Sequence, residues 1–238
     1  MFPTTHGSVL DRVRSADPEV RHAAFSVLAA GYWRPSYQYV RLRWHLAPED
    51  AEDAVQGFFA VAFEKRYVET FDPAKARFRT FLRVCLDRFV QRDRASESAQ
   101  KRGGATPRLS LDFPGAERDL ARHLTAPAAD PDAFFRDETI RSLCARTVEL
   151  MRAEAADTSR ARAFDVFSRH DLADDDASYR SVAEALGLTV AQVTNDLHAA
   201  RRRFRELALA ELRALVATDE EFRAEARDLF GLVLEVAD

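Results

Sequence analysis

The chain has 238 residues, of which 31% are charged and 47% hydrophobic. This composition is typical of a globular protein with charged surfaces, and it excludes a disordered chain. No run of about eighteen apolar residues occurs, so we expect no membrane insertion. The first residues, Met1 to Arg12, lack the basic and apolar parts of a secretory signal, and we therefore expect a cytoplasmic protein.

The net charge of -4 conceals two oppositely charged segments. Between Lys75 and Arg102, nine Lys and Arg stand against three Asp and Glu. From Glu206 to Asp238, three Arg stand against nine acids. Because a binding partner responds to the local charge, the basic segment keeps nucleic-acid binding open in a mildly acidic protein.

Nearly all apolar patterns in the chain have helical period, and no strand-like alternation stands out, so the sequence predicts an all-α fold. In the first half we expect a helix over about 18–45, a second helix opened by Pro48, and a basic helix after the break at Phe71-Asp72-Pro73. In the second half we expect helices over about 133–155, 160–168 and 179–186. A long helix after Thr189 and an acidic helix over about 220–236 complete the prediction.

The composition shifts toward Gly, Pro and Ser over about 96–131, which predicts a flexible linker. We therefore expect two small helical domains, over 1–101 and 132–207. The linker over 102–131 joins them, and an acidic helical extension over 208–238 follows the second domain.

The segment 178–205 has the pattern of a helix-turn-helix. Gly187 supplies a left-handed stop after a short amphipathic helix. Thr189 is expected to cap the second helix, and Gln192 three residues later completes a capping box. The inward stripe of this second helix consists of Val193, Leu197, Ala200 and Phe204.

The outward side of the second helix carries hydrogen-bonding and cationic side chains. In a helix-turn-helix this helix enters the major groove with its N-terminus first, so Gln192, Thr194 and Asn195 are predicted to face base edges. The side chains predicted to lie near phosphates are His198, Arg201, Arg202 and Arg205. A helical hairpin with a solvated face is the alternative, but stop, turn, cap and stripe all fall at the expected offsets.

Taken together, the two halves resemble sigma factors of the extracytoplasmic-function (ECF) type, bacterial proteins that bind core RNA polymerase and direct it to promoters. The first half is similar to region two of this family through AEDAVQGFF (51–59), FDPAKARFRTFL (71–82) and RDRASESAQKRGG (92–104). The second half is similar to region four through SYRSVAEALG (178–187) and LHAARRR (197–203). Two similar modules in the same order are more specific than either one alone.

The resemblance implies core RNA polymerase and promoter DNA as partners, with an anti-sigma or other regulatory protein as a further partner. It also implies that the acidic side of the helix opened by Pro48 docks on polymerase, through Asp50, Asp53 and Gln56. For the first half alone, a merely solvated face would be the preferred interpretation of these residues.

In the family, the loop and basic helix that follow open the duplex at the downstream promoter element and hold an unstacked base. Capture of single-stranded DNA requires aromatic surfaces and cations together. The side chains that could provide both are Tyr67, Phe71, Lys75, Arg77, Arg79 and Arg83. Other aromatic residues of this region, namely Phe78, Phe81 and Phe89, are assigned to packing.

Two features depart from the family pattern. Thr194 and Asp196 stand where many relatives carry Lys or Arg, and an acid near phosphates would weaken recognition of the upstream element. The acidic extension exceeds the minimal two-domain form. It could shield the basic DNA-reading helix, bind another protein, or only stabilise the fold.

Two other classes of function compete with this interpretation. A helix-turn-helix regulator that does not engage polymerase would usually dimerise on palindromic sites, and the long linker does not favour such rigid symmetry. An enzyme is not expected, since the six His lack metal-ligand spacing and no phosphate loop or nucleophile elbow occurs. We therefore expect no catalytic residue, no metal and no cofactor.

Overall fold

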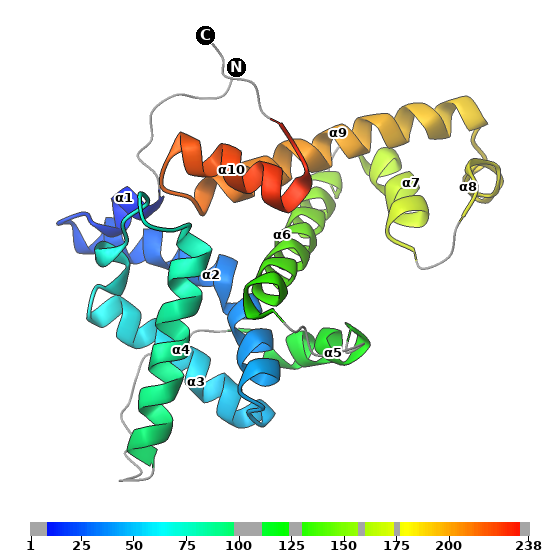
Figure 1. Cartoon of the computed structure of the whole chain (residues 1–238). Coiled ribbons are helices and arrows are strands. Elements are labelled where there is room, and N and C mark those ends of the chain that lie inside the picture. The colour runs from blue at the N-terminus through cyan, green and yellow to red at the C-terminus, as the bar shows by residue number, and fades with distance from the viewer. Residues whose placement is uncertain (1–8, 98–110, 124–129, 157–159, 174–176, 234–238) are drawn as a thin grey trace. The chain divides into compact units, whose positions relative to one another are not determined.

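The structure, a computed structural model, describes residues 9–97, 111–123, 130–156, 160–173 and 177–233 (Figure 1). Within these residues every regular element is helical, which confirms the all-α prediction. The chain forms two compact units: unit 1 comprises residues 1–142 and 212–238, and unit 2 comprises residues 143–211. The predicted boundaries differ, because they assign 132–142 to the second domain and treat the C-terminal segment as a separate extension.

The first half of unit 1 contains four helices and one 3-10 turn: α1 (Val9–Val13), α2 (Pro18–Arg43), α3 (Pro48–Glu64), η1 (Tyr67–Thr70) and α4 (Phe78–Glu97). Asp17 caps α2, because its carboxylate accepts hydrogen bonds from the first amides of that helix. Pro48 opens α3 as predicted, with Glu49 and Asp50 in the first turn. The sequence does not predict α1 and η1, which are too short to show a helical period.

Aromatic side chains fill much of the core of unit 1. Phe25 of α2 meets Phe59 of α3 edge to face, and Phe58 meets Phe89 of α4 in the same way. Tyr32 of α2 contacts Phe78 at the start of α4. The assignment of three aromatic residues to packing is confirmed, since each has ring contacts and is buried or half-buried: Phe78, Phe81 and Phe89.

A helix lies inside the segment that the sequence predicts to be a linker. This helix, α5 (Phe113–His123), packs on α2 (Figure 1). The Phe113 ring contacts Trp33 and Tyr37, and Arg41 Nε donates to the Glu117 carboxylate at 2.9 Å. The linker prediction is therefore wrong for 113–123, while 98–110 and 124–129 lie outside the described residues.

The acidic C-terminal segment forms α10 (Asp219–Phe230), which belongs to unit 1. Thr218 caps its start, and Gly231 ends it in the left-handed conformation. Leu215, which follows α9 (Val190–Ala214), fixes this segment against α2. A Cβ at Gly31 of α2 would lie 2.6 Å from Leu215 Cδ2, so a larger residue there would force the Leu215 side chain to shift. Of the predicted acidic helix, 234–236 lies outside the described residues.

Unit 2 contains α7 (Ala161–Asp171) and α8 (Tyr179–Leu186), together with most of α9 and the second part of α6 (Pro131–Ala155). All four predicted helices of this half are confirmed, and α8 has the predicted ends. No helix in the described part of the chain is long and apolar enough to cross a membrane.

Candidate nucleic-acid interfaces

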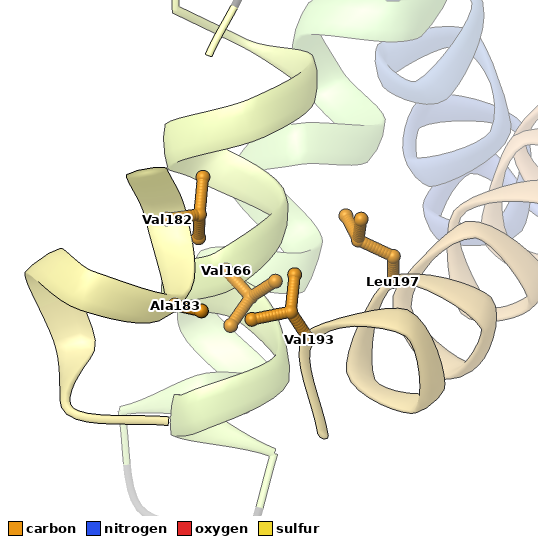
Figure 2. Packing of buried hydrophobic residues seen from close by; sticks show 5 residues of the cluster. All are labelled: Val166, Val182, Ala183, Val193 and Leu197. Carbon is orange, nitrogen blue, oxygen red and sulfur yellow. The ribbon is translucent and has the colours of Figure 1, made fainter. Parts of the chain in front are cut away.

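Helices α8 and α9 of unit 2 form a helix-turn-helix around a small apolar core. Val182 and Ala183 of α8 face Val193 and Leu197 of α9, and Val166 of α7 completes the cluster (Figure 2). All five side chains are buried. The third helix, α7, therefore fixes the angle at which α9 leaves the turn.

The turn between α8 and α9 follows the predicted stop and cap. Gly187 has a φ of 65°, and the Leu188 amide donates to the Ala183 carbonyl at 2.9 Å, which closes the end of α8. Gln192 N–H donates to Thr189 Oγ1 at 3.2 Å, and Thr189 N–H donates to Gln192 Oε1 at 2.8 Å. This reciprocal pair is the capping box that the sequence predicts.

We expect Gly187→Ala to lower the free energy of unfolding of unit 2 by about 1 kcal/mol. A Cβ at this position meets no atom within 4 Å, so the cost comes from the left-handed backbone alone. Urea unfolding monitored by circular dichroism measures the change. Gly187→Asn is the matched control, since asparagine tolerates this conformation better. Equal stability of the alanine variant and the unchanged protein would refute the strain argument.

The outward side of α9 presents most of the predicted DNA-facing side chains. A shallow groove on this helix is lined by Asn195, His198, Ala199, Arg201, Arg202 and Arg205. Gln192 is exposed, but its side-chain oxygen is engaged in the cap. Thr194 is half-buried, and its hydroxyl donates to the Val190 carbonyl at 2.9 Å. The cap and the α9 backbone thus partly engage Gln192 and Thr194, whereas Asn195 is exposed.

The arginines of α9 divide into two kinds. Arg201 donates twice to the Asp171 carboxylate, at 2.7 Å each, and this hydrogen bonding holds the pKa of Asp171 below its ordinary value. Arg203 binds Glu154 in the same bidentate manner and lowers its pKa. The Arg202 side chain is 77% exposed and Arg205 is also exposed. Of the predicted phosphate contacts, Arg202 and Arg205 are therefore the more available, and Arg201 the less.

Asp196 does not face the DNA side of α9, so the prediction that it repels phosphates is wrong. The residue is only 8% exposed, and its carboxylate accepts two hydrogen bonds from Arg162 of α7, at 2.8 and 3.1 Å. The sequence contained a signal for this placement. Asp196 lies three residues after Val193 and one before Leu197, on the same inward face.

In unit 1, the side chains predicted to melt DNA are mostly engaged within the protein. Phe71 is buried and contacts the rings of Phe78 and Phe81, so its predicted stacking on a base is wrong for this conformation. Arg77 and Arg79 form ion pairs with acids of α10. Arg83 donates to Asp132 at 2.6 Å and to Asp87 at 2.8 Å. Lys75 remains 82% exposed, with Asp72 3.2 Å away.

A second groove combines aromatic and cationic side chains, and no residue of α10 lines it. It has a volume of about 460 Å³ and lies where the end of α3 and η1 meet α4. Among the residues that line this groove, Tyr67 is the only one that the sequence predicts to bind DNA. Cys85 also lines it and is half-buried, and burial raises the pKa of its thiol. The other lining residues that matter for nucleic acid are Lys65, Phe81, Arg88, Phe89 and Arg92.

The predicted polymerase-binding residues share the solvent side of α3. Asp50 and Asp53 are exposed, whereas Gln56 is half-buried and donates to the Glu52 carboxylate at 3.3 Å. The opposite side of α3 is buried in the unit 1 core.

In the described parts of the chain, no group of three or more His, Cys, Asp and Glu could hold a metal ion. No protein-family model, no curated protein and no solved structure matches the chain.

Proposed function

We propose that the chain is an ECF-type sigma factor that binds core RNA polymerase and directs it to specific promoters. The helix-turn-helix of unit 2 carries this proposal, because its capped and packed α9 presents Asn195, Arg202 and Arg205 on one exposed side. A helix held in this way has the geometry with which proteins read the major groove.

For the upstream promoter element, α9 offers both base-reading and phosphate-binding groups. Asparagine can bind adenine through two hydrogen bonds at its major-groove edge, which makes Asn195 the proposed specificity residue. Arg202, Arg205 and His198 follow it along the helix and would neutralise phosphates on either side of the groove. Asp196, paired with Arg162, holds α9 on α7 and takes no part in reading.

For the downstream element, the groove beside η1 supports a role in holding single-stranded DNA. Stacking surfaces lined by cations bind single strands with little dependence on sequence. Tyr67 lines this groove together with Phe81, and Arg88 and Arg92 lie one helical turn apart on α4. These residues replace Phe71 in the proposed single-strand site.

Polymerase binding is assigned to the exposed side of α3, and Asp50→Lys with Asp53→Lys tests it. We expect this double variant to lose co-elution with purified core polymerase on gel filtration, because two carboxylates that face the partner become cations. Binding to duplex DNA, which rests on unit 2, should be unchanged. Glu64→Lys, an exposed acid at the end of the same helix, is the control.

The decisive measurement is transcription from genomic DNA with core polymerase and the purified chain, followed by sequencing of the transcripts. A shared upstream motif among the new start sites is the expected result. If the chain binds duplex DNA but neither co-elutes with polymerase nor starts transcripts, it is a helix-turn-helix regulator of the conventional kind.

A further inference from the structure

Helix α10 of unit 1 places three carboxylates on one side, at Glu221, Glu225 and Asp228. Their spacing of four and three residues keeps them on a single helix face. All three contact the beginning of α4. Arg79 Nε donates to both oxygens of Glu225, at 3.0 and 3.2 Å, and Asp228 pairs with Arg77 and Arg79 together.

Glu221 engages the backbone at the same place. One of its oxygens accepts a hydrogen bond from the Phe78 amide at 2.6 Å, and the other accepts from Ala217 N–H at 2.8 Å. Phe78 is the first residue of α4, where amides have no partner within the helix and the helix dipole favours negative charge.

The surface beneath α10 therefore has the composition of an anion-binding site. It joins the Phe78 amide, which has no partner within α4, with two guanidinium groups, which bind carboxylate and phosphate in similar geometry. The side chain of Arg79 is only 9% exposed and that of Glu225 only 4%, so α10 covers Arg79, whereas the Arg77 side chain keeps 40% of its surface exposed. In the described conformation, carboxylates occupy the positions that phosphate oxygens would take.

These ion pairs are a costly way to fix a helix. Burial raises the pKa of Glu225 although Arg79 and Arg77 lie beside it, which shows that desolvation opposes the charged form. Buried ion pairs add little net stability compared with apolar contacts of the same size. Ala226 and Leu229 of α10 are already buried and could hold the helix without the acids. The carboxylates are thus better explained by the arginines that they cover.

We propose that α10 is an internal mimic of a nucleic-acid backbone, which occupies the anion-binding surface at the start of α4 until a single strand displaces it. This inference rests on the proposed function, since it assumes that a strand held in the groove beside η1 also reaches the start of α4. Arg79 then becomes a DNA contact only after α10 has left, and the partly exposed Arg77 exchanges its acidic partners for the strand.

The test uses the full chain with Glu221→Gln, Glu225→Gln and Asp228→Asn, and a fluorescent oligothymidine as probe. Freeing two arginines should steepen the dependence of log affinity on log salt by about 1.4, which corresponds to about 25-fold tighter binding at 0.1 M salt. Fluorescence anisotropy over a series of salt concentrations measures both values. Adding Arg77→Gln and Arg79→Gln to the triple variant should abolish the gain.

The matched control changes three exposed acids of unit 1 instead, as Glu64→Gln, Asp219→Asn and Glu220→Gln. It alters the net charge equally and should leave the salt dependence nearly unchanged. The proposal would be overturned if the variant with Glu221→Gln, Glu225→Gln and Asp228→Asn unfolds at lower temperature but binds oligothymidine like the control. The role of α10 would then be only to stabilise unit 1.

Hydrogen exchange on the unaltered protein provides a second test that needs no variant. Excess oligothymidine should accelerate exchange of the amides over 219–230, whereas those of α3 should keep their protection. Unchanged protection of α10 in the bound protein would refute displacement. Neither test involves polymerase. Displacement of α10 can therefore be refuted while promoter-specific transcription is observed, and it can be supported while no such transcription occurs.

Discussion

Leu197→Ala should unfold the helix-turn-helix and abolish duplex DNA binding. Leu197 is 1% exposed and belongs to the α7–α8–α9 cluster (Figure 2), where removing a leucine side chain costs about 2 to 5 kcal/mol. In a unit of this size, such a loss lowers the melting temperature by about 10 °C or more. We expect the cavity to remain open, because Val166 and Val193 around it are branched and cannot extend into the space.

Two spectroscopic probes can show which of the two units unfolds in Leu197→Ala. Both tryptophans of the chain, Trp33 and Trp44, lie in unit 1. Far-ultraviolet circular dichroism should therefore show an early transition in Leu197→Ala that tryptophan fluorescence does not report. Leu150→Ala is the matched control, since Leu150 of α6 is 39% exposed and loses the same atoms. Identical melting of the two variants would mean that the cluster does not hold unit 2 together.

A second large effect is expected for Arg202→Gln combined with Arg205→Gln. If both arginines neutralise phosphates, the salt slope of duplex binding falls by about 1.8, and affinity at 0.1 M salt falls about 60-fold. The loss should be the same on promoter and on unrelated duplex, because phosphates carry no sequence information.

The control for this pair is Arg201→Gln with Arg203→Gln, which removes two cations from the same helix. These arginines already bind Asp171 and Glu154 within unit 2, so the variant should lose stability but keep most of its salt slope. Anisotropy titrations across a range of salt concentrations compare the two. Equal slopes for both double variants would show that the internal ion pairs do not decide which arginines reach DNA.

Local signals in the sequence were sufficient for the helices and for the turn of the helix-turn-helix. Pro48, Gly187 and the pair Thr189 and Gln192 act on their own backbone, so their roles follow from neighbours a few residues away. For the same reason the helical periods gave both ends of α8 and the start of α9, while α9 continues past the predicted domain boundary at 207. The exposed side of α9 followed from the same periodicity.

Features that depend on distant partners could not be predicted in this way. Pro114 and Gly115 read as turn residues, yet α5 forms because Phe113 and Glu117 find partners on α2. The ion-pair partners of the charged residues were harder still to predict from the sequence. Nothing in the basic segment indicates that Arg79 is covered by Glu225, since the whole of unit 2 lies between the two residues in the sequence.

Because unit 1 is made from residues 1–142 and 212–238, its last part is synthesised after the whole of unit 2. Chains grow at about 5 to 20 residues per second, so α2 and α4 leave the ribosome several seconds before α10. During this interval Leu215 is absent from its place against Gly31, and Arg77 and Arg79 lack their acidic partners. This side of unit 1 is therefore most cationic while the chain is being synthesised, until α10 pairs with the two arginines.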